Sequence, residues 1–210
     1  MGEILKFPVQ ATKLGYKRVK RRLKAVESPD QLTLFPEPMT RILDFAAAGL
    51  SCFEQALLLD ERADAKAAEL YRKAIEEQDC VADAYCNLGI IESRKGNTTK
   101  AFDCFTTSLK HNPRHSEAHY NLGNLYFDVN DFHLAQIHYE MAAEVEATFA
   151  NVYFNLALVQ AINNDFAAAA NALGKYQALV PAEEARHADE LLRSLKKSLA
   201  AAKNSRTGSK

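Results

Sequence analysis

The sequence predicts an all-α solenoid built from short antiparallel helix pairs. The main observation is a pattern of apolar and small residues that recurs every 34 residues from about Asp83 onward. A second observation is that glycine and proline are few, 8 and 6 in 210 residues, as expected for an all-α chain. One helix pair of this size cannot bury its apolar face alone, so the copies must stack on one another.

Residues 1–40 precede the repeats and form a basic, proline-containing segment that we expect to be flexible. The stretch that begins at Lys13 and ends at Lys24 holds seven basic residues and no acidic one. Such a run is usually solvated, and its functional interpretations are a contact with nucleic acid or with an acidic protein surface. Three prolines between Ser28 and Pro38 disfavour a helix there and favour an extended backbone.

A five-residue motif lies inside this proline-containing stretch. The sequence Gln31-Leu32-Thr33-Leu34-Phe35 resembles the docking motif by which bacterial replication and repair proteins bind the sliding clamp. The resemblance implies that Gln31 is hydrogen-bonded at the mouth of a pocket, while Leu32, Leu34 and Phe35 fill its apolar interior. The alternative is an apolar linker that packs back on the solenoid, because exposed apolar side chains normally need cover.

Three repeats in phase occupy residues 82–115, 116–149 and 150–181. Each repeat has a small residue where its helices approach, one small residue in the second helix, and a large residue four positions later. In chain order these are Gly89, Ala101 and Phe105, then Gly123, Ala135 and Tyr139, then Ala157, Ala169 and Leu173. The turns between the helices are predicted at Gly96-Asn97, Asn130-Asp131 and Asn164-Asp165.

This spacing resembles the tetratricopeptide repeat (TPR) family. The resemblance implies a right-handed superhelical solenoid in which the first helix of each repeat lines a concave groove for a peptide or a partner segment. Upstream, residues 41–79 resemble a degenerate repeat with a first helix from about residue 41 to 61. Downstream, residues 182–203 are predicted to form a capping helix, and residues 204–210 are expected to be disordered.

The resemblance places an asparagine at the same groove-facing position of three repeats, Asn87, Asn121 and Asn155. An Asn amide both donates and accepts, so it can hold a peptide backbone without reading side chains. The other residues predicted to line the groove or its rim are Tyr120, Asn124, Phe154, Asp83, Glu117, Phe127, Asp128 and Leu158. Because the rim is acidic and lacks cations that could hold a carboxylate, the expected guest is basic or amphipathic. Two segments of the chain itself are candidates, the basic run from Lys13 to Lys24 and the stretch from Gln31 to Phe35.

The sequence offers no catalytic constellation, and we expect neither an enzyme, a metal site nor a cofactor. His111, His115 and His119 are four residues apart, but Pro113 prevents them from sharing one helix face. Four cysteines without a CxxC pair indicate a reducing, cytoplasmic setting, and no apolar run is long enough for a membrane span.

Two functional hypotheses remain open at this stage. The first is a non-enzymatic scaffold that binds a protein or peptide in the groove of the repeats. The second is an adaptor that contacts nucleic acid through the basic run and docks on a sliding clamp through Gln31–Phe35.

Overall fold

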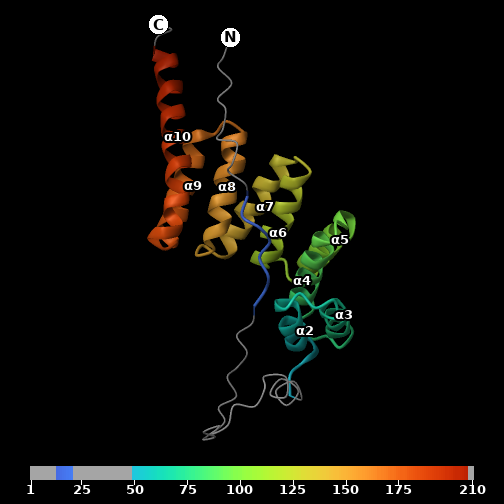
Figure 1. The fold of residues 1–210 in the computed structure, drawn as a ribbon. Coiled ribbons are helices and arrows are strands. Elements are labelled where there is room, and N and C mark those ends of the chain that lie inside the picture. The colour runs from blue at the N-terminus through green and yellow to red at the C-terminus, as the bar shows by residue number, and fades with distance from the viewer. Residues whose placement is uncertain (1–12, 21–48, 208–210) are drawn as a thin grey trace, which may run out of the picture. The chain divides into compact units, whose positions relative to one another are not determined.

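A computed structural model describes residues 13–20 and 49–207 of the chain, and these residues are helical apart from connecting turns and the extended stretch 13–20 (Figure 1). The fold class is all-α, as predicted, with consecutive antiparallel helix pairs. The helices are α2 (Cys52–Glu61), α3 (Ala67–Glu76), α4 (Val81–Arg94), α5 (Thr98–His111), α6 (Ser116–Asp128), α7 (Phe132–Val145), α8 (Ala150–Ile162), α9 (Phe166–Leu179) and α10 (Ala182–Thr207).

The described residues form two compact units, whereas the sequence suggests one solenoid over residues 41–181. The α2–α5 unit consists of residues 18–20 and 49–111, and the α6–α10 unit consists of residues 13–17 and 112–207. The division follows the end of α5 at His111, where Pro113 cannot continue the helix. Each unit therefore holds its own part of the extended stretch 13–20.

The turns inside the helix pairs stand at the positions that the sequence indicates. Gly96, Asn130 and Asn164 have positive φ angles of 78°, 62° and 64°, a backbone region that glycine and asparagine tolerate best. Asp131 and Asp165 then cap the next helix, because each side chain accepts a hydrogen bond from the backbone N–H three residues later. The local sequence thus ends one helix and starts the next.

The close approach of paired helices depends on glycine in two repeats. A Cβ atom on Gly89 would lie 2.7 Å from the ring of Phe105, and a Cβ on Gly123 would lie 2.7 Å from the ring of Tyr139. Phe105 and Tyr139 are fully buried, so neither ring has room to move away. The absence of a side chain at these positions lets the second helix place its aromatic ring directly on the first.

Two predicted helix boundaries are wrong. The helix expected from about residue 41 is interrupted, because α2 begins at Cys52 after a capping box formed by Ser51 and Glu54, and residues 41–48 lie outside the described residues. The last helix, α10, continues to Thr207, beyond the expected end at residue 203. No proline or glycine occurs between residues 182 and 207 to stop it. None of the described helices is long and apolar enough to cross a membrane.

Candidate functional site

In the α6–α10 unit, two buried asparagines hold the backbone of residues 13–17. Asn155 accepts a hydrogen bond from the N–H of Leu14 (2.7 Å) and donates to its carbonyl oxygen (3.0 Å). Asn121 does the same with Lys17, at 2.8 Å for both hydrogen bonds. Both asparagines are 0 % exposed. Each amide satisfies both backbone groups of one residue, so the contact depends on an extended backbone and not on the side chain that it carries.

A network of polar groups behind Asn155 fixes its orientation. The Tyr120 hydroxyl lies 2.8 Å from the carbonyl oxygen of Leu14 and 2.9 Å from that of Gly15, and it donates its proton toward them. Asn124 accepts hydrogen bonds from Asn155 (2.8 Å) and from the Tyr139 hydroxyl (2.7 Å). Burial raises the pKa of Tyr139, so its hydroxyl keeps the proton that it donates. The amide of Asn155 is thus held in one orientation by its neighbours as well as by the segment.

The α2–α5 unit repeats this arrangement with Asn87, which is also 0 % exposed. Its Oδ1 accepts from the N–H of Val19 (2.9 Å), and its Nδ2 donates to the carbonyl oxygen of Val19 (3.2 Å) and to the Tyr71 hydroxyl (3.2 Å). The Tyr71 hydroxyl lies 3.4 Å from Oδ2 of Asp60, toward which it donates. Val19 itself is 7 % exposed. A single relay therefore connects the backbone contact of Asn87 to a buried carboxylate.

Basic side chains of the segment contact acidic or aromatic side chains of the helices. In the α6–α10 unit, Lys13 pairs with Asp128 at 3.2 Å, and Lys17 lies over the ring of Phe149 at 5.3 Å from its centroid. In the α2–α5 unit, the segment forms ion pairs between Arg18 and Asp60 (2.7 Å) and between Lys20 and Glu61 (3.3 Å). The four described cations of the segment that begins at Lys13 thus face complementary groups within their own units.

Several residues predicted for the groove have other neighbours. The ring of Phe154 packs on Tyr176 at 5.2 Å between centroids, and Leu158 belongs to the same buried core. Phe127 packs edge-on against Phe132. Two further predicted rim residues, Asp83 and Glu117, are half-buried near the starts of α4 and α6. Leu14 of the segment packs against the same buried cluster, and the assignment of these residues to the groove stays a prediction.

Glu117 belongs to a separate polar cluster at the start of α6. It accepts a hydrogen bond from Ser116 (3.0 Å) and lies 3.3 Å from Nδ1 of His115. Burial raises the pKa of Glu117, but the neighbouring side chains of His115 and Ser116 act against this rise, and the net effect is a lowered pKa. His115 also caps α6, since its Nδ1 accepts from the N–H of Ala118. This cluster stabilises the beginning of the helix.

Sequence reasoning missed residues that contact or support the segment, and these are Asp60, Glu61, Tyr71 and Phe149. Asp60 directly follows Leu57, Leu58 and Leu59, and one acidic residue after an apolar run is a signal that could have identified it. Tyr71 occupies a recognised scaffold position, so its second role as a hydrogen-bond relay had no separate signal. The predicted clamp-docking residues, Gln31 to Phe35, lie outside the described residues.

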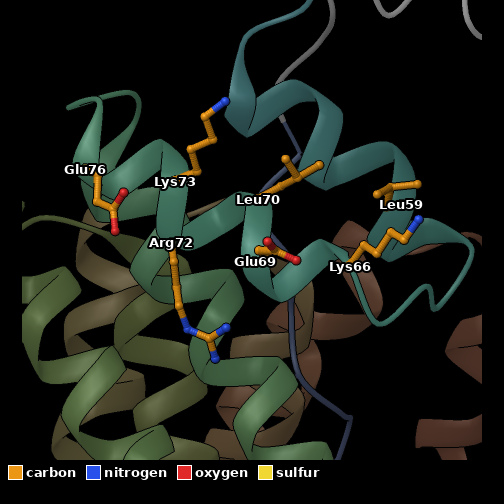
Figure 2. Close-up of a pocket in the computed structure, with 7 residues that line it drawn as sticks. All are labelled: Leu59, Lys66, Glu69, Leu70, Arg72, Lys73 and Glu76. Carbon is orange, nitrogen blue, oxygen red and sulfur yellow. The ribbon is translucent and has the colours of Figure 1, made fainter.

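A hollow of about 490 Å³ lies along α3, apart from the contacts of the segment (Figure 2). The seven lining residues come from the last turns of α2 and from α3 with its N-cap, and they are Leu59, Lys66, Glu69, Leu70, Arg72, Lys73 and Glu76. Cations and acids alternate along this lining, so it presents no uniform charge to a ligand. Within the described part of the chain, no group of three or more His, Cys, Asp and Glu side chains is placed to hold a metal ion.

Two models of the tetratricopeptide repeat match the sequence, one over residues 82–115 and one over residues 104–137. Solved structures with the same fold include the first TPR of Spaghetti (RPAP3) bound to the HSP90 peptide SRMEEVD. It has 19 % identity and a TM-score of 0.52, and the match covers 57 % of this chain and 95 % of that one.

Two further structures give the same result. The NMR structure of the first TPR domain of human RPAP3 has 20 % identity and a TM-score of 0.52, with 59 % and 96 % of the two chains covered. A crystal structure of MamA has 18 % identity and a TM-score of 0.54, with 71 % and 86 % covered. At these identities the likeness shows the fold. The two family models identify tetratricopeptide repeats within residues 82–137 of this chain.

Proposed function

We propose that this chain is a non-enzymatic protein-interaction scaffold whose first helices bind an extended, basic peptide segment by its backbone. Residues 13–20 act in this proposal as an intramolecular ligand that a partner segment replaces. The observation that carries the proposal is the set of paired hydrogen bonds from Asn87, Asn121 and Asn155 to the backbones of Val19, Lys17 and Leu14. Buried amides that satisfy both backbone groups of one residue favour any extended chain that can reach them.

The charge of the face supports a basic partner. Asp60, Glu61 and Asp128 each pair with a cation of the segment. The first TPR of Spaghetti is bound to a peptide, SRMEEVD, that carries three acidic residues and one basic one. That structure supports a peptide as the kind of partner, while the acids of the present chain favour the opposite charge.

The alternative function, an adaptor on nucleic acid, gains no support from the described residues. Lys13, Arg18 and Lys20 are each paired with an acidic side chain, so their charges are compensated within the fold. Phosphate binding would require breaking these pairs first. We therefore retain the scaffold as the proposed function.

The test uses a chain whose own segment cannot bind. The triple variant Lys17→Pro, Arg18→Ala, Val19→Pro removes two of the N–H groups that the asparagines hold, and proline still accepts an extended backbone. We call it the displaced variant. A fluorescent peptide of residues 10–24 should bind the displaced variant saturably. It should bind the wild-type chain at least about tenfold more weakly, because a tethered competitor acts at an effective concentration of about 1 mM.

A peptide that carries the same three substitutions is the matched ligand control and should not bind. The matched receptor control is Asn163→Ala in the displaced variant, since Asn163 is an exposed asparagine that bonds to Gln136. It should leave peptide affinity unchanged, whereas Asn121→Ala should reduce it. Equal binding of the peptide to the wild-type chain and the displaced variant would contradict the proposal that residues 13–20 occupy the site.

A further inference from the structure

Asp60 has the properties of a selectivity site for one side chain of the bound segment. We infer that it selects an arginine at the position directly before the residue held by Asn87, so that the recognised element in the α2–α5 unit is an arginine followed by a small apolar residue. This inference rests on the proposed function, because it names the partner chemistry that the peptide-binding face accepts. The neighbouring asparagine sets the register, and Asp60 reads the side chain.

The contact between Arg18 and Asp60 uses several edges of the guanidinium group. Nη2 donates to Oδ1 of Asp60 (2.9 Å) and to its backbone carbonyl oxygen (3.1 Å). Nε lies 2.7 Å from Oδ2, within ion-pair distance, although its N–H forms no hydrogen bond. A planar guanidinium can address both carboxylate oxygens and the adjacent carbonyl at once, which the compact ammonium of lysine does not match in shape.

The location of Asp60 makes a cation necessary. Its side chain is 3 % exposed, and it lies one residue before the end of α2, where the helix dipole and the free carbonyl groups are negative. Burial raises the pKa of Asp60, while the charges of Arg18 and then Arg94 act against this rise. A buried carboxylate at a helix C-terminus is unfavourable without a close cation.

A second cation near Asp60, Arg94, does not replace Arg18 as its ion-pair partner. Arg94 approaches Oδ1 only to 3.4 Å, and its side chain is 50 % exposed. It stands at the edge of a hollow of about 230 Å³ that Asp60 borders together with the turn after α2 and the end of α4. Arg94 therefore leaves the shorter and more buried contact with Asp60 to the segment's own arginine.

The relay from Asn87 through Tyr71 to Asp60 ties this selectivity to the backbone register. Asn87 binds both backbone groups of Val19, so the residue before it must present its side chain to Asp60. Val19 is 7 % exposed, which limits the size of the residue at its position. Lys20, in contrast, is 68 % exposed in its pair with Glu61, so its position imposes little selectivity.

The first experiment measures amide hydrogen exchange of Val19 in the full chain by NMR. Arg18→Lys should make this exchange at least about tenfold faster, although the charge is kept, because lysine cannot reproduce the forked contact. The matched control is Arg62→Lys, an exposed arginine at the end of α2, which should change the exchange by less than about twofold. In an Asp60→Asn background the difference between Arg18 and lysine at this position should disappear.

The second experiment titrates the displaced variant with the peptide of residues 10–24 and with its Arg18→Lys form. The lysine peptide should bind at least about tenfold more weakly, and Asp60→Asn in the receptor should remove this preference. Equal affinities of the two peptides, or unchanged Val19 exchange in Arg18→Lys, would overturn the arginine selectivity. If neither peptide binds while Val19 exchange still depends on Arg18, the arginine site stands within the chain and the proposed binding of a partner segment fails.

Discussion

The two units hold adjacent parts of the same segment with the same amide chemistry but with different charge environments. In the α2–α5 unit, the side chains of Arg18 and Asp60 are 15 % and 3 % exposed. In the α6–α10 unit, those of Lys13 and Asp128 are 15 % and 46 % exposed. The first acid is removed from water and the second is not. An exposed ion pair contributes little to binding, whereas a buried acid that loses its partner is strongly unfavourable.

In the scaffold that we propose, this difference separates two tasks, general affinity and selectivity. Backbone contacts by Asn87, Asn121 and Asn155 are available to any extended chain and provide general affinity. Selectivity requires a group that penalises the wrong side chain, and a buried carboxylate does so more strongly than an exposed one. The α2–α5 unit has such a group close to its asparagine.

The largest effect is expected when the two ion pairs are broken in the same way. Arg18→Met should accelerate amide exchange at Val19 about 100-fold, because it leaves Asp60 buried with a weaker partner. Lys13→Met should accelerate exchange at Leu14 by less than about threefold, because Asp128 remains hydrated. Both amides can be followed in one NMR experiment. Equal effects of the two substitutions would show that burial of the acid does not distinguish the units.

A smaller effect is expected on the stability of the helix pairs, and it should be equal in both units. Gly89→Ala and Gly123→Ala should each reduce the free energy of unfolding by about 1 to 2 kcal/mol, because the new methyl group meets a buried aromatic ring. Urea unfolding followed by circular dichroism measures this change. Gly174→Ala is the control, since nothing lies within 4 Å of its added Cβ, and it should be neutral or stabilising.

The third repeat suggests a second substitution that should compensate for Gly89→Ala. It has Ala157 and Leu173 where the first repeat of the three has Gly89 and Phe105. Phe105→Leu should therefore recover most of the stability lost by Gly89→Ala, because the smaller side chain leaves room for the methyl group. If the double variant is no more stable than Gly89→Ala alone, the contact with the ring is not the cause of the loss.

The smallest expected effect is a pH-dependent loss of stability that arises in the α6–α10 unit. Nδ1 of His119 lies 3.1 Å from Nδ1 of His138, an arrangement in which one neutral ring donates to the other. Burial, followed by the charge of His119, lowers the pKa of His138 to about 4, and burial also lowers the pKa of His119. Between about pH 6.5 and 4 the unfolded chain therefore binds protons that the folded chain does not, so stability falls as pH decreases.

With allowance for partial solvent exposure, the loss between pH 7 and pH 5 should be about 1 kcal/mol. Urea unfolding at both pH values measures it. His138→Gln should reduce the loss, whereas His133→Gln, at an exposed position of the same helix, should leave it unchanged. A wild-type chain whose stability is the same at pH 7 and pH 5 would argue against two neutral, buried histidines.

Local features were predictable because they depend on residues that are close in the sequence. The positive φ angles at Gly96, Asn130 and Asn164 follow from residue types that tolerate this conformation. Two errors, the start of α2 and the end of α10, concern boundaries. The capping box at Ser51 could have corrected the first of them, since Ser51 and Glu54 have its spacing.

The candidate site was less predictable than the fold. The position of Asn87 within its repeat suggested a backbone contact, but not that the contact is made to Val19, 68 residues away. The place of Phe154 in its repeat suggested a groove position, but not that its ring packs on Tyr176. A repeat pattern defines where a residue stands on a helix, while its neighbours depend on which surfaces the folded chain brings together.

The sequence alone determined the class of this protein, because a 34-residue period of small, large and turn residues specifies helix pairs that must stack. It also predicted an asparagine at the same position of three repeats, Asn87, Asn121 and Asn155. Only the tertiary structure decided which segment meets those amides and that Arg18 pairs with Asp60, 42 residues further along the chain. The physical reason is that helix periodicity depends on residues that are close in the sequence. The pairing of a buried charge depends on distant residues that meet only after folding.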